Sequence, residues 1–181
     1  MFNLTQIYPS LAPQNYLADL GEHSCIHWSL GPRIVALLWE DNDTTMRSIV
    51  PSEVQKIEGG EEGAWGIAMA NLGREVDAMR LKLGIAELPG GGKAAFFDQH
   101  WLASATILHN GLISWISNEL EARELMALVP CRESIAYFSS DCTTEVVEAV
   151  ESFSAKASAA SRKPFGRNLF RVAPEGPIFI E

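Results

Sequence analysis

Apolar and polar residues alternate along the chain with two different periods, and the period predicts the secondary structure. Short apolar runs broken by turn residues predict a strand at 25–31 and two strands within 33–50, on either side of the acidic turn 41–43. Between about 61 and 79, apolar residues recur at every third or fourth position, which is typical of an amphipathic helix. The first part of the chain is therefore predicted to form strands followed by a helix.

The same order of strands and helix repeats in the middle of the chain. Strands are predicted at 80–88 and 93–97, with three glycines between them, and Asp98 is the expected N-cap of a second helix over 99–124. Apolar side chains cover a wide arc of this helix. We therefore expect it to be the central element of the fold, buried on more than half of its circumference.

A third repetition and a final hairpin complete the chain. The segments 125–130 and 134–140 are predicted strands, and Asp141 or Thr143 is the expected cap of a third helix. The last residues form a predicted hairpin that turns at Pro174–Pro177. A proline so close to a strand favours a position at the edge of the sheet.

Hairpins that alternate with three helices predict an α+β fold. We expect an antiparallel or mixed sheet built from those hairpins, with the helices packed mainly on one face, in preference to a doubly wound parallel sheet. Residues 1–181 are expected to form a single α+β domain, since a chain of this length can bury a sizeable core. Residues 1–24, which contain Pro9 and Pro13, are expected to be largely loop-like.

The charge balance narrows the set of partners. The 14 basic and 23 acidic residues give a formal net charge of −9, which repels nucleic acid and anionic membrane surfaces. No apolar run approaches the roughly 18 residues of a membrane span, and the N-terminus lacks the pattern of a secretory signal. Three cysteines without a C-x-x-C pair suit a reducing compartment. We therefore expect a cytoplasmic protein that binds neither nucleic acid nor membrane.

The glycine run at 90–92, followed by Lys93, raises the question of phosphate binding. A P-loop needs a Ser or Thr after its lysine and then a helix, whereas Ala94 and an apolar strand follow here. We therefore interpret the glycines as a hairpin turn, because glycine takes positive φ without a steric clash.

Two further patterns have both a chemical and a structural interpretation. His23, Cys25 and His27 alternate as on one face of a strand and offer three zinc ligands, but their spacing matches no familiar zinc signature. Cys142 precedes a predicted helix, where a thiol can become a nucleophile, yet no histidine is near it in sequence. The simpler interpretation is ordinary packed side chains, so no metal, cofactor or catalytic residue is predicted.

Arg132 and Glu133 lie between two predicted strands, where a turn usually has Gly, Asn or Asp. The guanidinium group has two interpretations. It forms an ion pair with a neighbouring acid such as Asp98 and braces the turn, or it contacts a carboxylate or phosphate group of a ligand.

Several short motifs follow one another over most of the chain, from about residue 7 to residue 172. They are IYPSL, LLWEDNDTTMRSI, GIAMANLGRE and ALVPCRESIAYF. Their order and spacing resemble the YtpQ-like family of bacterial proteins, which is grouped as a domain of unknown function. The resemblance implies a cytosolic bacterial protein without an established reaction.

Two patterns of that family carry over to particular residues. The Ala-x-x-Asn-Leu pattern matches residues 68–72, with Asn71 as its asparagine, and the Pro-x-Arg-Asp loop matches Pro130 and Arg132. Glu133 stands where aspartate is usual in the family. The resemblance therefore adds Asn71 to Arg132 and Glu133 as a polar cluster, which is either a site or an internal brace.

Two functions follow as hypotheses. We expect a non-enzymatic binding or protein-interaction module, whose partner is another protein or a small anionic ligand. The alternative is a small enzyme of unassigned reaction, in which arginine orients an anionic substrate and a carboxylate moves a proton. The candidate ligand-binding residues are Asn71, Asp98, Arg132 and Glu133. Five tryptophans leave a homodimer open, since aromatic residues are frequent both at interfaces and in cores.

Overall fold

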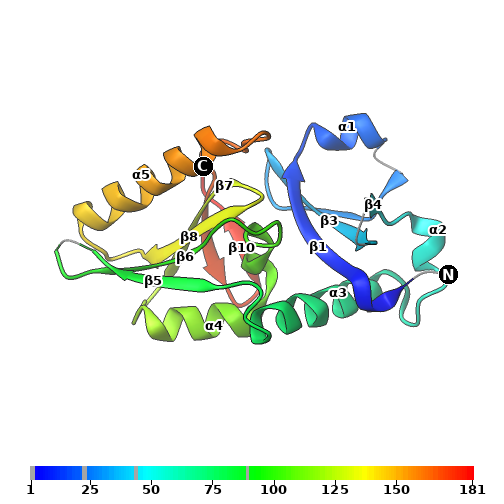
Figure 1. Cartoon of the computed structure of the whole chain (residues 1–181), viewed down its shortest axis with the longest axis horizontal. Coiled ribbons are helices and arrows are strands. Elements are labelled where there is room, and N and C mark those ends of the chain that lie inside the picture. The colour runs from blue at the N-terminus through cyan, green and yellow to red at the C-terminus, as the bar shows by residue number, and fades with distance from the viewer. Residues whose placement is uncertain (1–2, 22–23, 43–44, 89) are drawn as a thin grey trace. The chain divides into compact units, whose positions relative to one another are not determined.

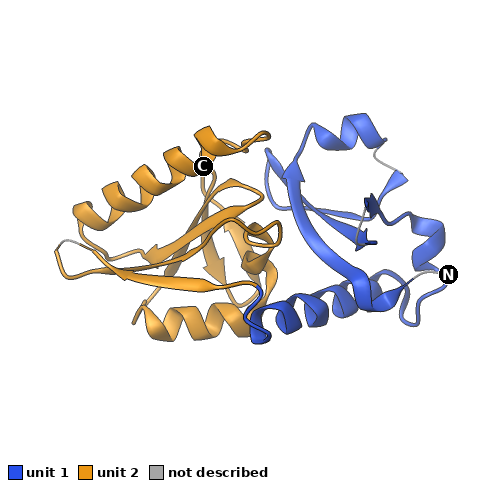
Figure 2. Ribbon diagram, in the orientation of Figure 1, with its two compact units in different colours: residues 1–80 blue, residues 81–181 orange. Residues whose placement is uncertain are grey.

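The structure is a computed structural model that describes residues 3–21, 24–42, 45–88 and 90–181. The chain divides into two compact units, residues 1–80 (unit 1) and residues 81–181 (unit 2) (Figure 2). Each unit has its own sheet and its own cluster of buried apolar side chains. That the two units fold together as one domain stays a prediction.

Unit 1 is built around one central strand. Its elements are the 3-10 helix η1 (Leu4–Gln6), the strands β1 (Ile7–Pro13), β2 (His27–Ser29), β3 (Ile34–Asp41) and β4 (Met46–Ser48), and the helices α1 (Tyr16–Leu20), α2 (Pro51–Val54) and α3 (Gly60–Asp77) (Figure 1). The sheet order is β1-β3-β2, β4 also pairs with β3, and every pairing is antiparallel. Residues 34–38 of β3 are fully buried, and apolar clusters that contain Leu38 on one side and Val35 and Leu37 on the other cover this strand.

Helix α3 packs closely on the sheet of unit 1 because small residues face it. Ala64 and Ala68 are fully buried in a cluster that includes Ile7 of β1 and Leu38 of β3. Full burial of a side chain the size of Ile7 or Leu38 contributes roughly 1.5–3 kcal/mol to the free energy of unfolding. The helix predicted over about 61–79 is therefore confirmed, with bounds of Gly60 and Asp77.

The structure corrects the expectation that residues 1–24 are largely loop-like. This segment contains η1, the seven-residue strand β1 and the helix α1. Pro9 and Pro13 fit within β1 because it lies at the edge of its sheet and, among the described strands, pairs with β3 alone. A missing amide on its free side therefore breaks no ladder bond. Proline content alone was therefore a poor guide to loop structure here.

Unit 2 contains a six-stranded antiparallel sheet. Its elements are β5 (Leu83–Glu87), β6 (Lys93–Phe97), β7 (Leu125–Cys131), β8 (Ser134–Ser139), β9 (Leu169–Ala173), β10 (Gly176–Phe179), the 3-10 helix η3 (Ser104–Leu108), α4 (Asn110–Glu119) and α5 (Thr144–Ala160). The strand order is β10-β9-β7-β8-β6-β5, which places β10 at an edge. Pro177 lies in β10, so the expected edge position of the last hairpin is confirmed.

Successive side chains of β8 point to opposite faces of the sheet of unit 2, and both faces are buried. Ala136 and Phe138 pack with Val146 and Val150 of α5 on one face. Tyr137 points to the other face, where its hydroxyl lies 2.8 Å from the Thr106 hydroxyl of η3. Burial raises the pKa of Tyr137 far above its ordinary value. In Figure 1, α5 and α4 accordingly lie on opposite sides of this sheet.

The structure also corrects the prediction of one continuous helix over 99–124. Helix α4 begins only at Asn110, where Nδ1 of His109 accepts a hydrogen bond from the Leu112 amide (3.1 Å) and caps the helix. In a continuous helix, the Ser104 amide would donate to a carbonyl oxygen of the preceding helical turn. It donates instead to the carbonyl oxygen of Arg132 in the β7–β8 turn (3.1 Å).

Burial within this region also differs from the expectation. Every residue of η3 is buried, whereas α4 buries one face and leaves Trp115 46% exposed. The central element of unit 2 is therefore η3 and not the longer helix that follows it.

The α+β class with antiparallel strands is confirmed. The predicted hairpins are present as β3–β4, β5–β6, β7–β8 and β9–β10. The strands form two sheets, and η3 with α4 adds a helical layer to unit 2 opposite α5. None of the helices in the described part of the chain combines the length and apolarity of a membrane span.

Candidate functional site

Arg132 and Glu133 form the two-residue turn between β7 and β8 and pair with each other. Nε and Nη2 of Arg132 lie 3.2 and 3.1 Å from Oε1 of Glu133. The hydroxyl of Ser161, at the end of α5, donates to Oε2 of Glu133 (3.3 Å). Both side chains of the ion pair are more than a third exposed, 39% and 38%. The guanidinium is therefore engaged by the neighbouring acid, as the brace interpretation requires.

Asp98 lies close to this turn but has a different partner from the one considered in the sequence. Its Oδ1 accepts a hydrogen bond from the hydroxyl of Ser134, the first residue of β8. The His100 amide also donates to the Glu133 carbonyl (3.4 Å). The expected role of Asp98 as a helix N-cap is wrong, because the amides of His100 and Ser104 donate hydrogen bonds to the β7–β8 turn and no continuous helix follows Asp98. Asp98, Arg132 and Glu133 therefore belong to one braced region, which we call the turn cluster.

Asn71 belongs to unit 1 and has its own set of partners there. It is 2% exposed, and its amide donates to the carbonyl oxygens of Leu4 (2.9 Å) and Ile7 (2.7 Å). Its Oδ1 accepts from the Arg74 guanidinium. These bonds tie α3 to the segment where η1 becomes β1. Asn71 therefore acts as an internal brace in unit 1.

The glycine run has a steric explanation. It forms the turn of the β5–β6 hairpin, as predicted, and Gly90 and Gly91 have φ of +85° and +82°. A Cβ on Gly92 would lie 2.3 Å from Cγ2 of Val146, which is fully buried on α5. Lys93 pairs with Glu121 (3.2 Å). The glycines thus let the hairpin turn lie against α5, and Lys93 has an acidic partner.

The proposed metal and nucleophile residues gain no support from their surroundings. His23 lies outside the described residues, and among those described no cluster of three metal-ligating side chains occurs. Burial raises the pKa of the Cys25 thiol. Burial likewise raises the pKa of Cys142, which is the opposite of what a thiolate nucleophile needs.

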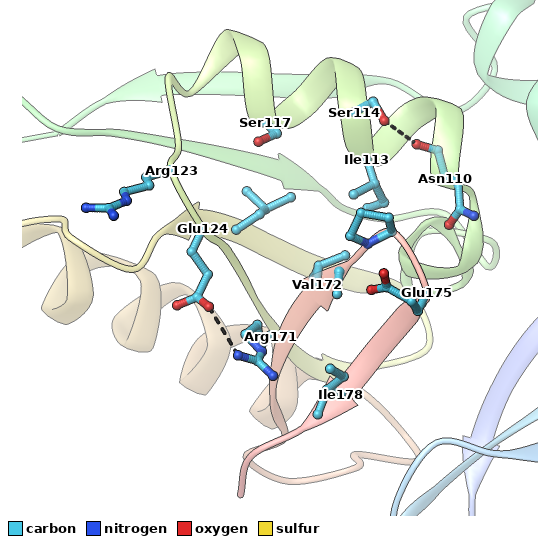
Figure 3. Close-up of a pocket in the computed structure, with 13 residues that line it drawn as sticks. Asn110, Ile113, Ser114, Ser117, Arg123, Glu124, Arg171, Val172, Glu175 and Ile178 are labelled. Carbon is cyan, nitrogen blue, oxygen red and sulfur yellow. Dashed lines mark hydrogen bonds and ion pairs between the residues drawn. The ribbon is translucent and has the colours of Figure 1, made fainter.

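Unit 2 contains a cavity of about 580 Å³ that is separate from the turn cluster. It lies between α4, the start of β7 and the β9–β10 hairpin (Figure 3). Its volume falls within the roughly 300–1,000 Å³ typical of small-molecule sites. Its apolar lining residues are Ile113, Leu125, Val172, Ala173, Pro174 and Ile178. We call this space the hairpin cavity.

The serines of the hairpin cavity are bound to the main chain. The hydroxyl of Ser114 donates to the Asn110 carbonyl (3.0 Å), and that of Ser117 donates to the Ala122 carbonyl (3.2 Å). Among the described residues, neither hydroxyl is paired with a general base, the arrangement that would activate a serine as a nucleophile. These contacts hold the wall formed by α4 in place.

Four charged residues also line the hairpin cavity. They are Arg123, Glu124, Arg171 and Glu175. Nη1 of Arg171 lies 3.4 Å from Oε1 of Glu124, and both side chains are about half exposed. Figure 3 shows the Glu175 carboxylate directed from the hairpin turn back toward Val172, whereas Arg123 is directed away from the other lining residues.

Sequence reasoning missed the hairpin cavity and also a second arginine cluster. The cavity combines residues 110–125 with residues 171–178, which no local pattern connects. The second cluster is in unit 1, where Arg47 binds the buried Glu40 and also Glu53. Glu40 and Arg47 are equidistant from the centre of the β3–β4 turn and pair across it. That symmetry was a signal from which their contact could have been found.

Comparison with protein-family models, with curated proteins and with solved structures finds no match to this chain. The resemblance to the YtpQ-like family therefore stays a prediction.

Proposed function

We propose that this protein is a non-enzymatic binding module and that its ligand occupies the hairpin cavity of unit 2. The observation that carries the proposal is the composition of that cavity. Apolar residues and a few charged groups line it, and the serine hydroxyls are already bound to main-chain carbonyls. This combination suits retention of a small molecule or a peptide segment more than chemistry on it.

The turn cluster supports the same proposal. Arg132 is engaged by Glu133, Glu133 by Ser161, and Asp98 by Ser134. Glu133 occupies the Nε and Nη2 edge of the guanidinium, so a substrate anion would have to share Arg132 with this carboxylate. The alternative function, an enzyme that acts on an anionic small molecule through these residues, needs that shared contact. A cytoplasmic bacterial setting and a homodimer remain companion predictions.

A matched pair of tryptophan variants tests the proposal. Ser114→Trp fills the hairpin cavity from α4, and Asn118→Trp places the same side chain one turn further along, outside the lining. Both positions are exposed, so both variants should fold. The probes are acetate, citrate, inorganic phosphate, decanoate, leucine and trileucine, each titrated into isotopically labelled protein by NMR.

We expect at least one probe to shift the amides of Leu125, Val172 and Ala173 in the wild type and in Asn118→Trp, but not in Ser114→Trp. A panel without such a probe, or binding that survives Ser114→Trp unchanged, overturns the proposal. If probe-induced amide shifts are instead lost in Arg132→Ala and retained in Ser114→Trp, the turn cluster is the binding site, as the alternative function requires.

A further inference from the structure

Helix α4, which forms one wall of the hairpin cavity, is capped by a histidine. Nδ1 of His109 accepts a hydrogen bond from the Leu112 amide (3.1 Å), one of the amides that a helix leaves without a main-chain partner in its first turn. An Nδ1 atom that accepts carries no proton, so the imidazole is neutral and its proton is on Nε2. Ser, Thr and Asn, the usual N-cap residues, accept through an oxygen that does not titrate. The cap of α4 is therefore made by a side chain that can lose this capacity as the pH falls.

The residues around His109 make the first turn of α4 dependent on this cap. Gly111 is the second residue of α4, and glycine disfavours a helix. A Cβ at this position would lie only 3.3 Å from Cε1 of His109, so glycine leaves room for the imidazole ring. The Ile113 amide donates to the carbonyl oxygen of His109 (3.0 Å). Both the side chain and the main chain of His109 thus hold the first turn.

The charged groups around this turn do not compensate a positive charge on His109. From residue 101 to residue 118, His109 is the only titratable side chain, and Glu119 lies at the far end of α4. The elements in contact with η3, which are β7, β10 and α4, otherwise contain no charged residue, and η3 itself contains none. The charged groups that line the cavity beside the turn are Arg123, Glu124, Arg171 and Glu175. Their formal charges sum to zero. A proton on Nδ1 therefore removes the acceptor and places a positive charge at the positive end of the helix dipole.

We propose that His109 is a pH-sensitive switch for the wall of the hairpin cavity. While Nδ1 is unprotonated, the first turn of α4 is closed. Asn110, Ile113 and Ser114 then line the cavity, with the Ser114 hydroxyl bound to the Asn110 carbonyl (Figure 3). As the pH falls through the range in which histidine side chains take up a proton, the cap is lost and this turn frays. The loosening of the wall needs no ligand, whereas its consequence, weaker binding in the cavity at acidic pH, rests on the proposed function.

Two substitutions fix the cap in either state. His109→Asn keeps a side-chain acceptor that does not titrate, and His109→Lys has a permanent positive charge and no acceptor. Hydrogen exchange at about pH 7.5 and about pH 5.5, expressed as protection relative to the unfolded chain, reports the opening of the turn at Leu112 and Ile113. In the wild type, this protection should fall about fivefold at the lower pH, the factor that loss of a typical N-cap produces. It should stay high at both pH values in His109→Asn and low at both in His109→Lys.

The histidine at the other end of η3 provides the matched control. Nδ1 of His100 accepts from the Leu102 amide (3.2 Å), so it has the same chemistry outside the cavity lining. His100→Asn should leave the pH response of Leu112 and Ile113 as it is in the wild type. A response that His100→Asn removes, a wild type without a response, or an equal fall in His109→Asn overturns the inference.

Binding tests the consequence for the cavity separately. The six probes of the NMR panel are titrated at both pH values into the wild type and His109→Asn. At the lower pH, a probe that shifts the cavity amides should bind the wild type about fivefold more weakly than His109→Asn, by the same N-cap factor. Equal affinities of the two proteins overturn the regulation of the cavity. If no probe shifts those amides, the proposed function fails, and the exchange result alone decides the switch.

Discussion

Two arginine–carboxylate clusters, one in each unit, show how burial changes the role of the same chemistry. In unit 1, Arg47 joins Glu40, whose side chain is 4% exposed, to Glu53 of α2. In unit 2, Arg132 pairs with its neighbour Glu133, and both are more than a third exposed. The first cluster joins separate elements across a buried carboxylate, whereas the second stays within one turn at the surface.

The unit 1 cluster is also anchored to the main chain. The Asn3 amide donates to Oε1 of Glu40 (2.9 Å), and the Val50 amide donates to Oε2 of Glu53 (3.2 Å). Buried polar groups are costly to leave without partners, whereas exposed groups are hydrated by water. The comparison therefore predicts large effects for buried polar side chains of unit 1 and small effects for the turn cluster.

The largest effect is expected for Asn71→Leu. The substitution leaves the carbonyl oxygens of Leu4 and Ile7 without their side-chain donor. The bond to Ile7 is buried and the bond to Leu4 is partly buried, so the loss of both costs about 3 kcal/mol of unfolding free energy. Urea unfolding followed by circular dichroism measures the change. The control Asn118→Leu, at an exposed position of α4, should change stability by less than about 0.5 kcal/mol. Equal effects of the two substitutions would remove burial as the explanation.

A smaller loss is expected for Glu40→Gln. The amide side chain keeps some hydrogen bonding but loses the ionic contact to Arg47, which is 43% exposed and can be hydrated. We expect a cost of about 2 kcal/mol, below the range for a fully buried pair. Hydrogen exchange of the β3 and β4 amides reports it locally. Glu58→Gln, exposed in the turn before α3, is the matched control. Unchanged protection in Glu40→Gln would place the stabilisation elsewhere in unit 1.

The same carboxylate predicts a pH dependence. Burial opposes ionisation of Glu40, but the Asn3 amide and the Arg47 guanidinium outweigh it, so the pKa of Glu40 lies below its ordinary value. A depressed folded pKa adds stability above the pKa of the unfolded chain, and this contribution is lost as the pH falls through the folded value. Unfolding free energies measured across the acid range should therefore fall less steeply in Glu40→Gln than in the wild type. Parallel curves would exclude Glu40 as a source of the acid sensitivity.

The hairpins of the fold were predictable because their signals are local. The glycine run was correctly assigned to the turn of β5–β6, and two apolar runs separated by a short polar segment placed β7–β8. The start of α4 was not predictable in the same way. It depends on bonds from residues 100 and 104 to the turn at 132–133, some 30 positions away in sequence.

The candidate site illustrates the same limit. Arg132 stood out because its residue type is unusual for a turn, which is a local property. The burial of Glu40 depends on strand pairing, and the hairpin cavity depends on α4 and the last hairpin coming together. Both features follow from contacts distant in sequence, such as the pairing of Glu40 with Ile7 of β1, so they have no local signal of the kind that the Glu40–Arg47 pairing has.

The smallest effect is expected in the turn cluster. Exposed ion pairs contribute about 0.2–1 kcal/mol, and the Arg132–Glu133 pair lies in this class. Arg132→Ala and Glu133→Gln should each cost less than about 1 kcal/mol, and the double variant should cost little more than either alone, since both remove the same contact. Arg162→Ala, exposed just beyond α5, is the control for loss of charge.

A coupling energy between Arg132 and Glu133 above about 2 kcal/mol would make the turn cluster as important for stability as the cluster of unit 1. If Arg132→Ala instead leaves stability unchanged and abolishes a phosphate-induced thermal shift, the result supports the alternative function, in which the exposed Arg132 binds an anionic ligand.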